Sequence, residues 1–330
     1  MRETAFLKIN EAKWKKFEGL LVNRKAQQPD LLAELFVEVT EDLSYSKTHY
    51  PESTTTKYLN AMALRFHQAI YKNKKEEKGR FGKFWKYELP FLFKAHHREL
   101  LYAFIIFMIA CLIGAVSAAY DDRFVRLILG DSYVNMTLEN IEKGDPMAVY
   151  KKMDSGVMFL YITWNNIKVS FFAFVLGLFF SFGTGYMLFN NGVMLGSFQY
   201  FFYKKGLLLT SFLTIWIHGT LEISAIVIAG CAGLVMGNSI LFPGTYTRME
   251  SFKKGAKNGL KIVVGLIPIF IAAGFLESFI TRHTEYPSAV KAGIILVSAA
   301  FIIYYFILYP IKLHTHANRE NSIRPQQGLQ

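Results

Sequence analysis

The chain has 330 residues, a mean hydropathy of +0.23 and a formal net charge of +12 at pH 7. Its apolar residues cluster after Leu100 in runs of about 20, the length that crosses a bilayer, and this pattern excludes a soluble protein. In a membrane protein, the excess of Lys and Arg indicates positive-inside topology and attraction to anionic lipid headgroups, so no nucleic-acid partner is expected. The sequence predicts an all-α fold, a polytopic helical bundle of about five or six membrane segments with a small cytosolic helical domain before it.

Residues 1–99 are predicted to form the cytosolic helical domain. Amphipathic helices are expected over residues 10–24, from Pro29 and from about Thr54, with a turn at residues 50–53 between the last two. No cleavable signal peptide is expected, because this region is polar and charged. The first membrane span then acts as the membrane signal.

The end of this domain, residues 72–99, mixes basic and aromatic side chains. It carries nine Lys or Arg and four Glu among several Phe, Trp and Tyr. Such a composition just before a span predicts a helix that lies on the membrane, bent at Pro90, and binds anionic lipid headgroups. The same composition is typical of single-stranded nucleic-acid binding, but the position of the segment favours the membrane.

Residues 100–311 are predicted to form the membrane domain. The first span is expected at about residues 101–119, and its basic flank places the N-terminus in the cytoplasm. Residues 121–167 then form an extracytoplasmic loop, and the second span follows at about residues 169–189. Asn165 and Asn166 precede that span and are expected to cap it or to bond a neighbouring helix. Gly192 and Gly196 form a small-xxx-small pair in a short aromatic helix, which indicates close helix packing and makes a homodimer plausible.

Residues 207–241 form the longest apolar stretch, with His218, Gly219 and Glu222 inside it. The stretch is too long for one span, and it predicts two helical pieces hinged near Gly219. A single crossing would place the basic residues after Arg248 outside, against the positive-inside rule, so a hairpin or two tilted crossings are expected. The last spans are predicted at about residues 260–280, with a kink at Pro268, and 289–308, before a disordered cytosolic tail at residues 312–330.

The polar residues of this stretch have three interpretations. His218 and Glu222 are four residues apart, so they share a helix face, and ionisable groups at membrane depth should be paired, neutral or facing a polar cavity. The first interpretation is structural: the two residues form a hydrogen-bonded pair, together with Thr220 or Glu277, that joins neighbouring helices. The second is a polar pathway for a proton, an ion or a small solute. The third is a metal or catalytic site. The metal site needs His218, Glu222 and Glu277 to converge around a zinc-like ion with an open position.

Enzymatic function is not favoured by any complete motif. The stretch lacks the second histidine of a His-Glu-x-x-His metalloprotease, and the chain contains no nucleophile elbow, phosphate loop or dinucleotide fingerprint. We therefore expect no cofactor other than a metal ion such as zinc.

Several short patterns resemble the stage II sporulation protein M family of multi-span membrane proteins. They are Asn165-Asn166-Ile167, Gly183-Thr184, Asn191-Gly192, Leu195-Gly196, His218-Gly219 with Glu222, and Glu277 with Thr281. The cytosolic part is similar to the amino-terminal region of longer members through Asp42-Leu43, Tyr50-Pro51, Leu59-Asn60 and Ile70-Tyr71. Together these patterns cover about residues 30–310.

The resemblance implies an architecture and a function, and together with the residue patterns above it leads us to predict two sets of residues. The intramembrane polar site would comprise His218, Gly219, Thr220, Glu222, Glu277 and Thr281, and the helix-packing set Gly183, Thr184, Asn191, Gly192 and Gly196. In spore formers the family member is implied to be a scaffold that recruits peptidoglycan-degrading partners during engulfment. The long cytosolic domain departs from that member. We therefore expect a non-enzymatic envelope scaffold in the bacterial inner membrane, with unidentified envelope or cytosolic protein partners.

Overall fold

The computed structural model describes residues 1–22, 29–72, 79–151 and 153–315. Within these residues all regular secondary structure is helical, which confirms the all-α fold. The chain divides into two compact units, Met1–Arg80 and Phe81–Gln330. The tail predicted at residues 312–330 begins later than expected, because the last helix runs to Thr315, and its remainder, residues 316–330, lies outside the described residues.

The first unit contains three helices, α1 (Glu3–Val22), α2 (Pro29–His49) and α3 (Thr54–Lys72). Pro29 is the first residue of α2. Proline is tolerated there because backbone N–H groups in the first turn of a helix have no acceptor within the helix, so its lack of an N–H costs no hydrogen bond. Trp14 and Phe17 of α1 are fully buried against apolar side chains of α2 and α3. The indole of Trp14 donates a 2.8 Å hydrogen bond to Asp42, so its polar atom is satisfied inside the packed unit.

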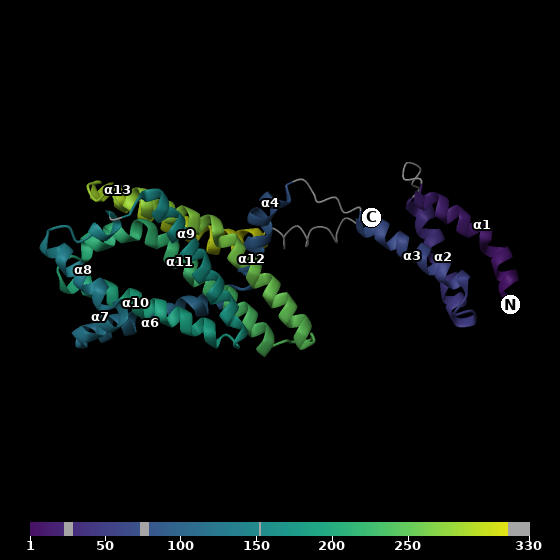
Figure 1. Cartoon of the computed structure of the whole chain (residues 1–330), viewed down its shortest axis with the longest axis horizontal. Coiled ribbons are helices and arrows are strands. Elements are labelled where there is room, and N and C mark those ends of the chain that lie inside the picture. Colours follow the sequence, from purple (N-terminus) through teal and green to yellow (C-terminus); the bar gives the residue numbers. More distant parts are fainter. Residues whose placement is uncertain (23–28, 73–78, 152, 316–330) are drawn as a thin grey trace. The chain divides into compact units, whose positions relative to one another are not determined.

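The second unit is a helical bundle with short helices at both ends. Its elements are α4 (Arg80–Lys83), η2 (Phe84–Glu88), α5 (Leu89–Ala95), α6 (His97–Tyr120), α7 (Asp122–Leu129), α8 (Asp131–Glu142), η3 (Ala148–Lys151), α9 (Ser155–Val175), η4 (Leu176–Leu178), α10 (Phe182–Lys204), α11 (Leu208–Leu241), α12 (Arg248–Phe275), η5 (Leu276–Thr281), α13 (Ser288–Ile303) and η6 (Tyr304–Leu308). Among the described residues, five helices are long and apolar enough to cross a membrane: His97–Tyr120, Ser155–Leu178, Leu208–Leu241, Arg248–Thr281 and Ser288–Thr315. In Figure 1, α4 lies at one end of this unit and α8 at the other.

Helix α11 is continuous over 34 residues, so the predicted hinge at Gly219 and the predicted hairpin are wrong. A glycine inside a helix costs only about 1 kcal/mol, which packing on both sides offsets. Of the five candidate spans, α11 is the most buried. In apolar surroundings its backbone groups are satisfied only if the helix continues, so polar side chains along it do not break it.

The direction of helix α10 explains how an unbroken α11 can agree with the charge pattern. Gly192 and Gly196 pack against Phe107 and Cys111 of α6, and Lys204 at the end of α10 pairs with Asp122 after α6. The two helices are therefore parallel over their length, and the segment predicted as a short aromatic helix is a full-length helix. These glycines contact α6 of the same chain, so they are not a dimer interface.

Helix α11 runs back antiparallel to α10. Gly237 lies against Ser181 and Gly230 against Leu188, so the end of α11 meets the start of α10. One passage of α11 thus returns the chain to the end of the bundle that carries α4. The basic residues that follow Arg248 lie at this same end.

The boundary between α9 and α10 differs from the predicted second span. The span expected at residues 169–189 ends at Leu178, where Phe180 and Ser181 take positive φ angles of 52° and 66° and turn the chain. Asn165 and Asn166 consequently lie in the middle of α9 and not before a span. Hydropathy along the chain does not reveal this, because Asn166 is covered by neighbouring helices.

The basic and aromatic segment packs into the second unit. Leu89 and Phe93 belong to its hydrophobic core, and Lys261 of α12 pairs with Glu88 at 2.7 Å. Pro90 is the second residue of α5, where a proline is tolerated. Binding of this segment to lipid headgroups stays a prediction, as does a kink at Pro268, through which α12 continues.

Close packing of α10 on α6 predicts a difference between two glycines of the same helix. A Cβ at Gly196 would clash with the backbone of Cys111, whereas a Cβ at Gly185 meets nothing within 4 Å. Gly196→Ala should destabilise the membrane unit by about 1–3 kcal/mol, because backbone atoms must move apart. Gly185→Ala should be neutral or stabilising by up to about 1 kcal/mol. Thermal unfolding of both variants in detergent measures the difference, and equal melting temperatures would contradict the close packing.

Candidate functional site

Three ionisable side chains from two helices meet inside the second unit. His218 and Glu222 belong to α11 and Glu277 to η5, and each offers a nitrogen or oxygen atom within 4.8 Å of the other two. The Nε2 of His218 lies 3.8 Å from Oε1 of Glu277. The side chain of His218 is 6% exposed and that of Glu277 is 14% exposed, so the group lies in the bundle interior. We call His218, Glu222, Glu277 and Thr281 the outer cluster.

Local helix geometry aims these side chains at one another. His218 and Glu222 are four residues apart on α11 and share a face. Glu277 and Thr281 are also four residues apart, on the π-helical turn η5 that ends α12. The hydroxyl of Thr281 is hydrogen-bonded to Nδ1 of His218 at 3.0 Å, which holds the imidazole with Nε2 towards Glu277. Single-turn π-helices of this kind are frequent at functional sites.

A polar side chain of α9 lies in the same region. The amide of Asn166 lies beside Glu222, yet its Nδ2 has no hydrogen-bond partner in normal geometry. A buried donor without a partner costs about 1–3 kcal/mol, so such atoms call for a specific reason.

Tyr150 of η3 covers the outer cluster from the polar loop. Its ring lies 5.7 Å from the imidazole of His218, centre to centre, at 63° between the planes. Burial raises the pKa of the Tyr150 phenol well above its usual value, and the carboxylates of Glu277 and Glu222 add to the shift. The phenol is thus held in its neutral form next to the imidazole.

Two predicted members lie apart from the outer cluster. Thr220 donates to the carbonyl of Trp216 on its own helix at 2.7 Å, and the Cα of Gly219 faces the side chains of Ile223 and Ile215.

The helix-packing residues lie elsewhere in the bundle. Thr184 donates to the carbonyl of Ala173 at 2.7 Å and packs on Gly233, and Asn191 bonds Met187 of its own helix at 2.8 Å. Gly183 lies against Leu176 in the preceding turn.

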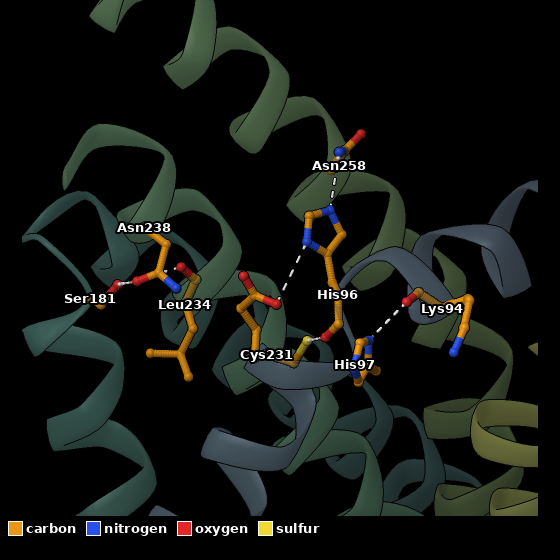
Figure 2. Close-up of polar contacts among 9 residues, drawn as sticks. Lys94, His96, His97, Ser181, Cys231, Leu234, Asn238 and Asn258 are labelled. Atoms are coloured by element: carbon orange, nitrogen blue, oxygen red, sulfur yellow. Dashed lines mark hydrogen bonds and ion pairs between the residues drawn. The ribbon is translucent and has the colours of Figure 1, made fainter. Parts of the chain in front are cut away.

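A second polar network lies at the opposite end of α11, and sequence patterns did not predict it (Figure 2). The amide Nδ2 of Asn258 donates a 3.2 Å hydrogen bond to Nε2 of His96, and Nδ1 of His96 lies 3.8 Å from Oε2 of Glu99. Asn238 bonds Ser181 at 3.3 Å, and it also lies beside Glu99. One sequence feature could have indicated this network: Glu99 places a carboxylate in the first turn of the apolar helix α6. We call these residues the inner network.

The two polar regions differ in composition. The outer cluster brings two carboxylates and an imidazole together, which are oxygen and nitrogen donors for a cation or acceptors for a proton. The inner network combines one carboxylate and one imidazole with amides and a hydroxyl. Among the residues that the structure describes, His218, Glu222 and Glu277 are therefore the group that could hold a metal ion.

Two family models match the chain. One described as Stage II sporulation protein M matches residues 103–282, more than half of the chain and all of the outer cluster. The other, described as a domain of unknown function (DUF8413), matches residues 4–72, which are the helices of the first unit. No curated protein matches the chain, and no solved structure does.

The buried contacts of His218 predict that its loss destabilises the bundle. His218→Ala leaves the hydroxyl of Thr281 without its partner and should lower the free energy of unfolding by about 1–3 kcal/mol. The matched control is Thr220→Val, which removes a bond only to the same helix and should cost less than about 1 kcal/mol. Thermal unfolding in detergent compares them, and an equal loss in both would show that the outer cluster adds no cohesion.

Proposed function

The chain belongs to the stage II sporulation protein M family of membrane proteins, and we propose that it acts as a non-enzymatic scaffold in the bacterial cell envelope. The observation that carries this proposal is the division into two units, each with its own hydrophobic core. A tightly packed membrane bundle suits an anchor. A separate helical unit with polar and apolar side chains on its surface suits the recruitment of other proteins.

The direction of the helices supports an arrangement in the inner membrane with six crossings. Helices α6, α9, α10, α11, α12 and α13 would cross in turn, with α10 included although its composition is less apolar. Lys83, Lys86 and Lys254 then face the cytoplasm, as the positive-inside rule expects, and Asp131 lies on the other side. The first unit and the C-terminal helix end would be cytoplasmic. Residues 121–154 would be available to envelope partners.

A homodimer and binding of anionic headgroups belong to the same proposal. The aromatic side chains of Phe81, Tyr87 and Phe91 are exposed beside basic residues, a composition that suits the membrane interface. Closed two-fold assemblies are the commonest oligomers, and the exposed apolar faces of α6 and α13 leave room for one within the bilayer.

Photo-crosslinking in native membranes tests the scaffold proposal. A photoreactive side chain at Val37 of α2 or at Leu127 of α7, which are 56% and 78% exposed, should form adducts with other proteins. The matched control is Leu112 of α6, which is 63% exposed on the apolar surface of a span and should react with lipid or with a second copy of this chain, but with no other protein. Absence of protein adducts at both test positions would contradict a scaffold.

The outer cluster favours a second candidate, a transporter or channel for a proton, ion or small solute. Ionisable residues inside a membrane bundle commonly mark transport pathways. Vesicles that contain the purified protein should then show a proton or cation flux that Glu222→Gln abolishes. Glu99→Gln in the inner network is a control at the other end of α11. An absence of flux in the wild-type protein would remove this candidate.

A further inference from the structure

We propose that His218, Glu222 and Glu277 bind one divalent transition-metal ion of the zinc class inside the membrane unit. The proposal goes beyond a scaffold function and is independent of it. Imidazole nitrogen and carboxylate oxygen both bind such an ion, and three protein ligands leave the fourth position for water. In this protein all three ligand atoms lie within 4.8 Å of one another.

Charge balance supports a cation at this place. Glu222 and Glu277 are partly buried in the bundle interior, and no Lys or Arg among the described residues forms an ion pair with either carboxylate. Two uncompensated negative charges in apolar surroundings would be costly. One divalent ion neutralises both carboxylates and leaves the imidazole neutral.

The orientation of His218 is the one that a metal ligand requires. Its Nδ1 is hydrogen-bonded to the hydroxyl of Thr281, and its Nε2 points towards Glu277. A histidine that binds a metal through one ring nitrogen commonly forms a hydrogen bond through the other, which fixes the ring. The contact with Thr281 thus prepares Nε2 for coordination.

An independent observation also indicates a ligand. Asn166 is 5% exposed and lies beside Glu222, but its amide Nδ2 has no hydrogen-bond partner in normal geometry. A donor in this position suits a water molecule bound to the metal, or the carboxylate oxygen that does not coordinate. The polar donor is therefore placed where the coordination sphere would extend.

The separation of the three groups is compatible with a small ion after a modest closure. Bonds of about 2.0–2.2 Å to zinc place neighbouring ligand atoms about 3.3–3.6 Å apart. Rotation of the flexible glutamate side chains suffices to shorten the present spacing of up to 4.8 Å. The mixed nitrogen and oxygen donors favour Zn²⁺ or Co²⁺ over Mg²⁺ and Ca²⁺, which prefer oxygen ligands alone.

The inner network provides a matched comparison within the same chain. His96 and Glu99 are also 3.8 Å apart, as His218 and Glu277 are. Their further neighbours are the amides of Asn258 and Asn238, and within the described part of the chain no second carboxylate completes a ligand set there. Glu99→Gln therefore removes a carboxylate from a similar pair without affecting the proposed metal site.

The test uses the full chain in detergent, freed of metal by a chelator. Zn²⁺ titrated into the protein should bind at one ion per chain, and Co²⁺ should give a visible absorption band from nitrogen and oxygen coordination. Glu222→Gln and Glu277→Gln should each weaken Zn²⁺ binding more than tenfold, and Glu99→Gln should leave it unchanged. Thr281→Val should weaken it about 10–100-fold, because the imidazole loses the bond that orients it.

Several outcomes would overturn the proposal. They are no saturable Zn²⁺ binding and no Co²⁺ band in the wild-type protein, or binding by both glutamate variants with wild-type affinity. The Co²⁺ band of the wild-type protein does not depend on whether a variant folds, and Thr281→Val alters only a buried hydroxyl. Protein adducts in the photo-crosslinking experiment do not depend on the metal, so failure of the scaffold proposal and failure of the metal site are distinguishable.

Discussion

Backbone contact along α11 is the constraint on which the membrane unit depends. Gly233 and Gly237 of this helix lie directly against the backbone of α9, η4 and the turn before α10, with no room for a side chain. Small residues permit this approach, and in a bilayer such van der Waals contact replaces the hydrophobic effect as the force between helices. Every other span is placed relative to α11.

This central position explains why both polar regions lie on α11. His218 and Glu222 near its start face η5 and α9, and Asn238 near its end faces the turn at Ser181. Glu222 and Asn238 are 16 residues apart, which is about 24 Å along a helix, so the two regions lie towards opposite faces of the bundle. The apolar, glycine-containing middle of α11 separates them. A continuous helix therefore holds the two regions at a fixed spacing.

Enclosure gives the outer cluster its chemistry. On an exposed surface the same three side chains would be solvated by water, and their charges would need no other compensation. Here α11, η5, α9 and η3 surround them, so their charges require compensation by protons or by a cation. The proposed metal site and the transport candidate are two answers to that requirement, and the scaffold proposal rests on different parts of the chain.

The pattern of residues along the chain was sufficient for the helical fold, the family and the three residues of the outer cluster. Pro29, the turn near residue 50 and the apolar runs predicted helices correctly, because these are local signals of conformation and hydropathy. The i, i+4 spacing of His218 and Glu222 placed them on one face for the same reason. The contact of these two residues with Glu277 was predicted for another reason: ionisable groups are rare inside membrane spans and are expected to pair with one another.

Tertiary packing alone decided the path of the chain through the bundle. Asn166 appeared to precede a span and Gly219 to hinge one, but neighbouring helices cover both residues and the helices run through them. Helix α10 was underestimated because its polar residues dilute its hydropathy, while its glycines fit against α6. The inner network is assembled from segments more than a hundred residues apart in the chain, such as His96 and Asn258. Burial and pairing are properties of contacts between distant segments, so the local sequence does not encode them in a readable form.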